Sequence, residues 1–487
     1  MSFSESFSDD SGDDCESLPP ARFRLVSLGD TEDLERYEKG GFHPVHLGDH
    51  YDDNRYKVIH KLGFGGFSTV WLAQDLVSRR LVALKIVVAD DSAAVEAKTV
   101  YSHTLLSTLE DDTRFITYLR FFNIHGPNGD HLCLVLPVLG PSNYQLSHYF
   151  ESRTTPQLAR SVGLQTAAAL SDLHSKGLVH GDLTPKNIIF RLSDRLRLNT
   201  CSIDEIYQIF GKPETAPLET ETGDQIGSEA PTYIVKPVNF FASKKDVLGD
   251  QICLIDFDQS FKNGNPPSKL LGTPVEFLAP EVAIGRSPSQ ASDIWALGCT
   301  IMRLRSGIGI FSAYDIDSPV DLVRAMINAF GDLPKHWGTP LFDRDGRPTQ
   351  DPKGKPLLDG YWNISLQQRI SAIWDFPASL DESKGSFFVH NDDPDTKPYP
   401  CSLSHKIWRP AAVFIKGVFL NGYSNEVDEI IEMLPKISKH ESDMLLDLLS
   451  TIFRFEPDER PTTNDLLTHP WFSITNEHFL LNEQATI

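Results

Sequence analysis

The spacing of apolar residues changes near residue 140, and this change constrains the fold more than any other feature of the chain. Before it, apolar residues gather in short runs of strand length, such as 56-YKVIHKLG-63 and 80-RLVALKIVV-88, with turn-forming residues between them. After it, they recur at helical spacing in 158–177 and 292–307. The sequence therefore predicts an α+β fold with a small β-rich lobe, a large helical lobe and a cleft between them. Further predicted elements are strands over 114–122 and 131–139 and a helix at about 92–109.

At 487 residues the chain is longer than one core usually organises, which favours two packed units with appendages. Residues 1–36 are predicted to form an acidic, Ser-rich disordered tail and lead-in, because residues 1 to about 20 combine low hydrophobicity with negative charge. Two loop-like stretches, about 191–250 and about 332–405, are predicted to be inserts of the large lobe. The remaining divisions are a small lobe over 37–140, a large lobe over 141–475 and a C-terminal tail over 476–487.

The charge is strongly acidic, with 45 basic against 67 acidic side chains and a formal net charge of −22. This balance argues against nucleic acid or an anionic membrane as a partner and favours a basic protein segment, although solubility alone would also explain it. The six cysteines lie far apart and form no C-x-x-C pair, which argues against a zinc site or a disulfide framework. No apolar run reaches membrane-spanning length, and no signal peptide is evident. We therefore expect the cytoplasm, the nucleus or both.

A glycine-rich turn, 62-LGFGGFSTV-70, lies between the first two predicted strands. Gly63, Gly65 and Gly66 would let this turn lie over a nucleotide with its backbone N–H groups directed at phosphate. A Gly-rich hairpin without a ligand is the alternative for this motif alone. No Gly-Lys-Ser/Thr sequence ends the turn, so it is not a Walker loop.

Lys85 lies inside the apolar run 80–88, where a charged group needs a partner. The best carboxylate candidate is Glu96, on the helix predicted to follow. A lysine on an edge strand that extends its ammonium group to solvent is the alternative, and the neighbouring glycine turn makes it less favourable.

Two further motifs carry acidic groups that follow apolar runs. In 179-VHGDLTPKNIIF-190, Asn187 stands five residues after Asp182, and in 252-ICLIDFDQSF-261, Asp256 ends a strand-like run. In phosphoryl-transfer enzymes this spacing provides an aspartate that orients the acceptor hydroxyl, together with an amide and a carboxylate that hold magnesium. A buried ion pair between Glu281 and Arg460 is also predicted.

Taken in order, these motifs make residues 56 to about 472 resemble a eukaryotic protein kinase. The chain more closely resembles the serine/arginine-rich (SR) protein kinases of the CMGC group, in particular their fungal members. The segments that carry this resemblance are 37-YEKGGFHPVHLGD-49, the run FSTVWLA from Phe67, 131-HLCLVLPVLG-140, 210-FGKPETAP-217 and 329-AFGDLPKHW-337.

The resemblance implies a monomeric serine/threonine kinase that uses ATP and Mg²⁺ and phosphorylates arginine/serine-rich proteins, such as splicing factors in mRNA processing. It implies no direct contact with nucleic acid or membrane. The implied catalytic residues are Asp182, Lys186 and Asn187, and the implied magnesium ligands are Asn187 and Asp256. The implied ATP-binding residues are Leu62, Gly63, Phe64, Gly65, Gly66, Phe67, Ser68, Thr69, Val70, Ala83, Lys85, Glu96, Leu136 and Val138. The family also binds basic segments in an acidic groove, for which the candidates are Asp315, Asp317, Asp321 and Asp332.

Three residues depart from the common kinase pattern. Gly181 replaces the arginine that docks a phosphorylated activation loop, and because SR-protein kinases also lack this arginine, we expect activity without loop phosphorylation. Thr184 replaces a lysine near the transferring phosphoryl group, and Lys186 is hypothesised to supply that charge; a solvated surface lysine is the alternative. Asp258 stands where Gly is usual after Asp-Phe. These departures favour a pseudokinase scaffold as the opposing interpretation, in which the inserts bind partners.

Overall fold

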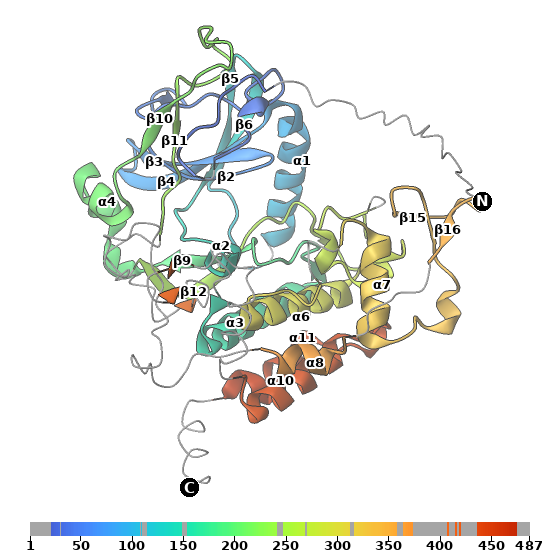
Figure 1. The fold of residues 1–487 in the computed structure, drawn as a ribbon. Coiled ribbons are helices and arrows are strands. Elements are labelled where there is room, and N and C mark those ends of the chain that lie inside the picture. The colour runs from blue at the N-terminus through green and yellow to red at the C-terminus, as the bar shows by residue number, and fades with distance from the viewer. Residues whose placement is uncertain are drawn as a thin grey trace, which may run out of the picture.

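The computed structural model describes residues 21–29, 31–107, 109, 114–148, 153–240, 247–267, 270–311, 316–357, 364–373, 407–408, 414–415, 418–419 and 436–474. A strand-rich lobe lies above a helical lobe (Figure 1), as the change in apolar spacing predicts. The disorder expected for residues 1 to about 20 and the tail over 476–487 lie outside the described residues, as does most of the second insert. No helix in the described part of the chain is long and apolar enough to cross a membrane.

The small lobe is a six-stranded antiparallel sheet in the order β1-β2-β3-β4-β6-β5. One face of the sheet is filled by residues such as Val58, Trp71 and Leu84, which are almost fully buried. Helix α1 (Ala89–Leu106) packs beside β6. The strands are β1 (His50–Tyr51), β2 (Tyr56–Gly65), β3 (Ser68–Asp75), β4 (Arg80–Val87), β5 (Arg120–Gly126) and β6 (Gly129–Leu136).

The strand predicted over 114–122 is wrong in its position. β5 begins only at Arg120, because the backbone of residues 114–116 bonds to a strand of the large lobe instead. Leu254 N donates to Arg114 O at 2.7 Å, and Ile116 N donates to Leu254 O at 3.0 Å. This segment therefore connects the two lobes before the sheet resumes.

The large lobe is built around α3 (Pro156–Ser175) and α6 (Gln290–Ser306), the two helices that the sequence predicts. The Thr155 side chain caps α3, and α6 ends at Gly307, whose φ of 78° is one that glycine adopts readily. The further helices and strands described in this part of the chain are α2 (Asn143–His148), β7 (Arg153–Thr154), β8 (Leu178–Val179), β9 (Ile188–Leu192), β12 (Leu248–Leu254), β13 (Phe261–Lys262), α5 (Pro280–Ala283), α7 (Pro319–Phe330), β14 (Leu341–Phe342), β15 (Pro348–Thr349), β16 (Lys355–Pro356), α8 (Leu366–Ser371), β17 (Ile407–Trp408), β18 (Phe414–Ile415), β19 (Val418–Phe419), α10 (Lys439–Ile452) and α11 (Thr463–Leu467).

Two buried ionic clusters join these helices. Arg460 binds Glu281 through two nitrogens, at 2.9 and 2.6 Å, which confirms the predicted pair. Glu441 on α10 accepts from Arg305 at 2.7 and 2.8 Å and from Arg160 at 3.0 Å. Removing one partner of such a buried pair costs about 3–5 kcal/mol, so these clusters hold the core in one arrangement.

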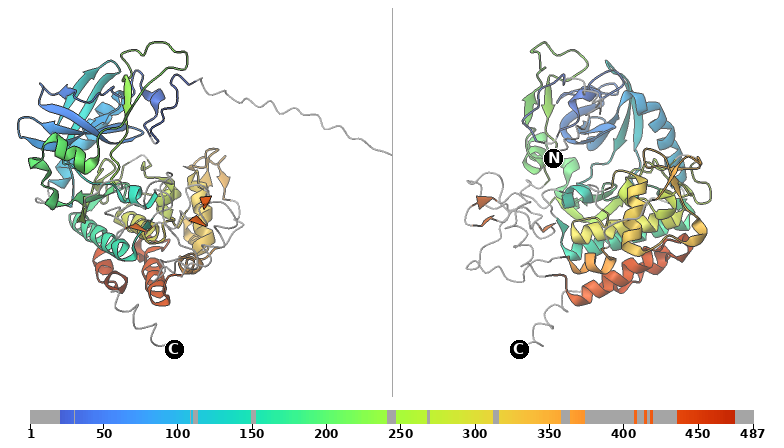
Figure 2. Two further views of the ribbon diagram at one scale, coloured as in Figure 1. Left: turned by 60° about the vertical axis from the view of Figure 1, so that its left-hand side comes forward. Right: turned by 45° about the vertical axis from the view of Figure 1, so that its right-hand side comes forward.

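The first insert does not stay on the large lobe to which its sequence position assigns it. Its helix α4 (Ile203–Phe210) is bonded to the small lobe, where Tyr207 Oη donates to Ile59 O at 3.2 Å. The hairpin of β10 (Thr215–Pro217) and β11 (Tyr233–Val235) lies beside the small-lobe sheet (Figures 1 and 2). Phe23, in the described part of the lead-in, bridges to Thr220 of this insert. The insert therefore contacts the small lobe and the lead-in.

Candidate active site

The loop between β8 and β9 carries Asp182 and is fixed from below by a carboxylate on α6. Asp293 accepts from His180 N at 2.8 Å and from Gly181 N at 3.0 Å, and it also pairs with His174 at 2.9 Å. These bonds hold the backbone before Asp182 against the core. Sequence reasoning gave Asp293 no role, since an aspartate in the first turn of a helix is common.

Asp182 and Asn187 meet as the spacing predicts. Asn187 Nδ2 donates to Asp182 Oδ2 at 2.9 Å and to Asp182 O at 2.8 Å. The other carboxylate oxygen, Oδ1, is buried without a hydrogen-bond partner among the described residues. One oxygen is therefore fixed by the protein, while the other can accept a proton or a hydrogen bond from a bound molecule.

The environment of Asp182 favours its protonated form. Burial and the negative charge of Asp256 raise its pKa from 3.8 to about 7, against the opposing effects of Asn187, Thr273 and Lys186. A carboxylate with a pKa near neutral pH is well suited to exchange a proton with a hydroxyl group.

Asp256 follows β12 and turns toward Asp182. Its φ of 62° lies in the left-handed region, and the next residue, Phe257, is buried against His180 at 4.9 Å between ring centroids and against Phe115 at 6.1 Å. Ile255 N donates to Asn187 O at 3.0 Å, which joins this segment to the catalytic loop. Phe257 thereby anchors this segment against His180 and Phe115.

A divalent cation fits Asn187 and Asp256 chemically. The Asn187 amide nitrogen is used in the two bonds to Asp182, which leaves its oxygen as the atom able to bind a cation. A carboxylate and an amide oxygen are ligands that Mg²⁺ accepts, usually together with phosphate oxygens and water. The structure thus offers the two protein ligands that the sequence indicates.

Asp258 does not disturb the backbone, contrary to the concern that its replacement of Gly raises. The left-handed residue of this motif is Asp256, and Asp258 is not among the described non-glycine residues with positive φ. Burial and the charge of Asp256 raise the pKa of Asp258, while Lys85 and Lys98 act in the opposite direction. Asp258 therefore lies in the field of Lys85.

The predicted pairing of Lys85 with Glu96 is not formed. Lys85 is half-buried on β4, and among the described residues no ion pair joins it to Glu96 on α1. The buried residues of α1 are Ser92, Ser102, Leu105 and Leu106, so only its ends are held in the core. Lys85 instead acts on the carboxylate of Asp258, whose pKa it lowers against the raising effects of burial and Asp256, so a different acidic group lies near its ammonium group.

The glycine turn leaves open space above it. A Cβ atom added at Gly63, Gly65 or Gly66 would meet no atom within 4 Å, and none of the three has a positive φ. The fold itself does not require glycine here, so the missing side chains preserve room for something outside the protein. Phe64 and Phe67 at the turn are 36% and 68% exposed, whereas Ser68 and Thr69 are buried.

Strand register brings the remaining predicted nucleotide residues to the same part of the small lobe. Gly63 pairs with Val70, Val70 with Lys85, and Lys85 with Leu134 across β2, β3, β4 and β6. Two residues along the same strands, Ala83 pairs with Leu136. Leu62 and Val138 are half-buried and pack against the main core.

Lys186 is an exposed residue of the catalytic loop itself. Its ammonium group lies 4.7 Å from the ring centroid of Tyr144 on α2, and its charge lowers the pKa of Asp182 slightly against the larger raising effects. Thr184 is buried. Lys186 is thus close enough to act on Asp182, and its role in transfer stays a prediction.

Gly181 could not be an arginine without moving the loop. Its φ is +80°, and an added Cβ would lie 2.5 Å from Gln259 O. Direct bonds join the activation segment to the catalytic loop here: Thr273 Oγ1 donates to Gly181 O at 2.6 Å, and Ser260 Oγ donates to His180 O at 2.8 Å. These contacts involve no phosphate group.

The aspartates proposed to bind basic segments differ in whether another side chain already binds them. Asp321 is already bound by Arg324 at 2.9 Å and by Ser318, whereas Asp317 and Asp332 are exposed. Asp315 lies outside the described residues.

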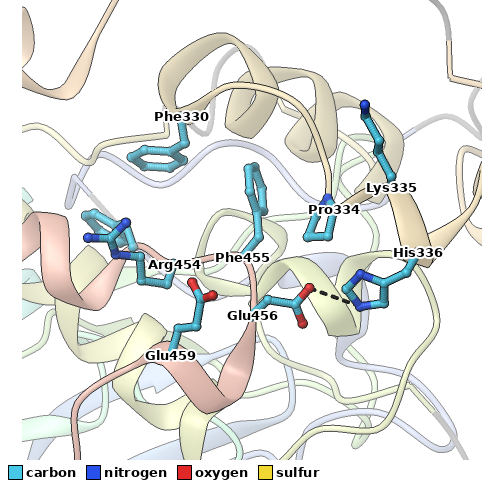
Figure 3. Close-up of a pocket in the computed structure, with 9 residues that line it drawn as sticks. Phe330, Pro334, Lys335, His336, Arg454, Phe455, Glu456 and Glu459 are labelled. Atoms are coloured by element: carbon cyan, nitrogen blue, oxygen red, sulfur yellow. Dashed lines mark ion pairs between the residues drawn. The ribbon is translucent and has the colours of Figure 1, made fainter.

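A separate cavity of about 460 Å³ lies in the large lobe and contains none of the predicted site residues. Figure 3 shows the His336–Glu456 ion pair, at 3.1 Å, among its lining residues. The lining residues are Phe330, Pro334, Lys335, His336, Phe453, Arg454, Phe455, Glu456 and Glu459.

Comparison with known proteins agrees with this geometry. Residues 56–199 and 235–376 match the family described as protein kinase domain, and the gap between them falls in the first insert. Serine/threonine-protein kinase SRPK of Physarum polycephalum is 29% identical over 461 residues, which cover 92% of each chain. Serine/threonine-protein kinase SKY1 of Saccharomyces cerevisiae is 35% identical over 173 residues, 34% of this chain and 23% of that protein. SRSF protein kinase 3 of Homo sapiens is 37% identical over 174 residues, 34% of this chain and 30% of that protein. The matched region is therefore less than a third of the length of the yeast and human relatives.

Proposed function

Because this chain belongs to the protein kinase family, we propose that it is a serine/threonine protein kinase that transfers the γ-phosphoryl group of ATP to hydroxyl groups of protein substrates. The observation that carries the proposal is the carboxylate of Asp182. Asn187 fixes one of its oxygens, and the other is a buried acceptor without a hydrogen-bond partner among the described residues. The names of the relatives, which include serine/threonine-protein kinases, support the choice of acceptor.

In this mechanism Asp182 orients the acceptor hydroxyl and accepts its proton while the hydroxyl oxygen forms a bond to the γ-phosphorus. The bond from that phosphorus to the bridging β–γ oxygen breaks, and ADP leaves. The glycine turn would lie over the phosphates, and Lys85 would contact the α- and β-phosphates. Asn187 and Asp256 would hold Mg²⁺, which supplies positive charge to the phosphates. Lys186 would add charge near the transferred group.

We propose arginine/serine-rich proteins as substrates. The name of the human relative, SRSF protein kinase 3, supports this class, and the net charge of −22 would attract basic segments and repel acidic ones. The same charge argues against nucleic acid as a partner. We further propose that the protein acts as a monomer in the cytoplasm, the nucleus or both.

The alternative is a pseudokinase that binds partners through its inserts. The missing ion pair between Lys85 and Glu96 favours this alternative, whereas the oriented Asp182 and the open glycine turn favour an enzyme.

One experiment separates these functions. The purified full chain is titrated with ATP and Mg²⁺ while its thermal stability is followed, and it is then incubated with labelled ATP and an arginine-serine peptide. We expect ATP to stabilise both the parent and Asp182→Asn, but only the parent to transfer phosphate. Equal transfer by the two proteins would refute the assigned role of Asp182, and a parent that binds ATP without transfer would establish the alternative.

A further inference from the structure

Residues 31–42, which precede the sheet, lie against the small lobe and are called the strap below. Tyr37 and Phe42 are almost fully buried, and they share a core cluster with Val88 and with residues of the first insert. The strap contacts the small lobe at three places, all of them next to the proposed ATP site.

The first contact is an ion pair inside the protein. Lys61 Nζ binds Glu32, and the side chains are 0% and 1% exposed. Tyr37 Oη donates to the other Glu32 oxygen at 2.6 Å. Lys61 directly precedes the glycine turn at the end of β2, and its ammonium group also lies 5.6 Å from the ring centroid of Phe64 in that turn. Burial of both charges has a desolvation cost that pairing must offset, so the strap fixes the end of β2 through a specific bond.

The second contact reaches the tip of the turn. The Arg36 guanidinium carbon lies 5.7 Å from the ring centroid of Phe67 and 5.2 Å from that of Phe42. Phe67 is 68% exposed with Arg36 in place, so Arg36 contacts a side chain that the small lobe leaves open but covers only part of it. A guanidinium group over an aromatic face is an attractive arrangement.

The third contact is made to the first turn of α1. The cap residue Val88 provides no side-chain hydrogen bond. Instead, Ala89 N donates to Gly41 O at 3.1 Å and Asp90 N to Gly40 O at 2.9 Å. The strap backbone thereby satisfies two N–H groups that a helix start leaves without partners.

We propose that the strap positions the glycine turn and α1 for ATP, with Glu32 and Arg36 as its positioning residues. This inference rests on the proposed function for the identity of the nucleotide. The three contacts join the glycine turn and the first turn of α1 to a segment of the same chain. The strap thereby restricts the conformations of the glycine turn before ATP binds, so less conformational entropy is lost on binding.

The test uses the full chain with Glu32→Gln, Arg36→Ala and the matched control Arg24→Ala. Arg24 also lies in the lead-in and also forms an ion pair, but its partner is Glu219 of the insert at 3.0 Å and not the glycine turn. For each variant we measure the Kd of a fluorescent ATP analogue, KM for ATP, KM for an arginine-serine peptide and thermal stability. We expect Arg36→Ala and Glu32→Gln to raise Kd and KM for ATP by about 2- to 30-fold, the scale of coupling through a packed network, and to leave peptide KM unchanged.

Arg24→Ala should change none of the nucleotide constants. If Glu32→Gln fails to fold, Arg36→Ala decides alone, because Arg36 is half-exposed. An Arg36→Ala protein with unchanged Kd for ATP, or one in which ATP and peptide constants worsen equally, would overturn the inference. A parent that binds the analogue but transfers no phosphate would refute the kinase activity, while a weaker Kd on Arg36→Ala would still support the strap.

Discussion

Replacing Asp182 by Asn should stabilise the folded chain, and it should do so only above acidic pH. The folded environment raises the pKa of Asp182 from 3.8 to about 7, chiefly by burial and by the charge of Asp256. Between these two values the folded state binds a proton that the unfolded state has released. Stability therefore falls as pH rises through this window, and the full cost of the ionised carboxylate is present above the folded pKa.

The shift of about three pKa units corresponds to roughly 4 kcal/mol, at about 1.4 kcal/mol per unit. At pH 5 less than half of this cost is expressed, so the advantage of Asp182→Asn should grow by roughly 3 kcal/mol between pH 5 and pH 8. Asparagine has nearly the same volume, and its carbonyl oxygen can still accept from Asn187 Nδ2, so the bond seen at 2.9 Å is retained.

Urea denaturation of the parent and of Asp182→Asn at pH 5, 6, 7 and 8 measures this difference. Asp317→Asn, which removes an exposed carboxylate elsewhere on the large lobe, is the control and should show no such trend. A stability difference that does not depend on pH, or one that shrinks toward pH 8, would refute the electrostatic reasoning. Loss of transfer alone would not test it, since removal of the base predicts that loss in any case.

Three further predictions concern the departures from the common kinase pattern and the acidic surface. Lys186→Ala should lower turnover by about 10- to 10³-fold, the scale of one lost electrostatic contact. Adding Thr184→Lys to this variant should restore part of the rate. Unchanged turnover in Lys186→Ala would mean that Lys186 has no role in transfer. Enzyme made in bacteria and treated with phosphatase should keep its activity. Gly181→Arg should lower the unfolding free energy by about 2 kcal/mol or more, because φ is +80° at this position and Gln259 O blocks the side chain. KM for an arginine-serine peptide should rise steeply with salt while KM for ATP changes less, because the Debye length falls from about 10 Å at 0.1 M to about 3 Å at 1 M; a peptide KM indifferent to salt would leave solubility as the role of the charge.

The sequence predicted the parts of the fold that short-range patterns determine. The run 158–177 gives α3 and the run 292–307 gives α6, because apolar spacing and end signals both agree there. The pairing of Asp182 with Asn187 followed from five residues of spacing in one loop. Contacts between distant segments were harder to foresee: β5 began late because residues 114–116 bond to Leu254, far away in the chain.

The strap shows a signal that sequence reasoning could have used. Lys85 drew attention because it is charged within an apolar run, and Lys61 in 56-YKVIHKLG-63 meets the same description. Its partner Glu32 lies 29 positions earlier, in the lead-in that was grouped with the acidic disordered tail over 1–36. A carboxylate that pairs inside the protein has the same local composition as one in a disordered tail, so only the three-dimensional arrangement separates them.

The replacement of the usual arginine by Gly181 can be understood from the backbone around it. An arginine at position 181 would place its Cβ 2.5 Å from Gln259 O, so the glycine lets the activation segment pass close to the catalytic loop. In that close approach, Thr273 Oγ1 and Ser260 Oγ donate directly to the carbonyls of Gly181 and His180. A charged side chain that waits for a phosphate would have to occupy the space that these bonds use. The absence of the arginine and the direct attachment of the activation segment therefore belong together. Neutral hydrogen bonds hold the catalytic loop in place, and these bonds need no phosphorylation.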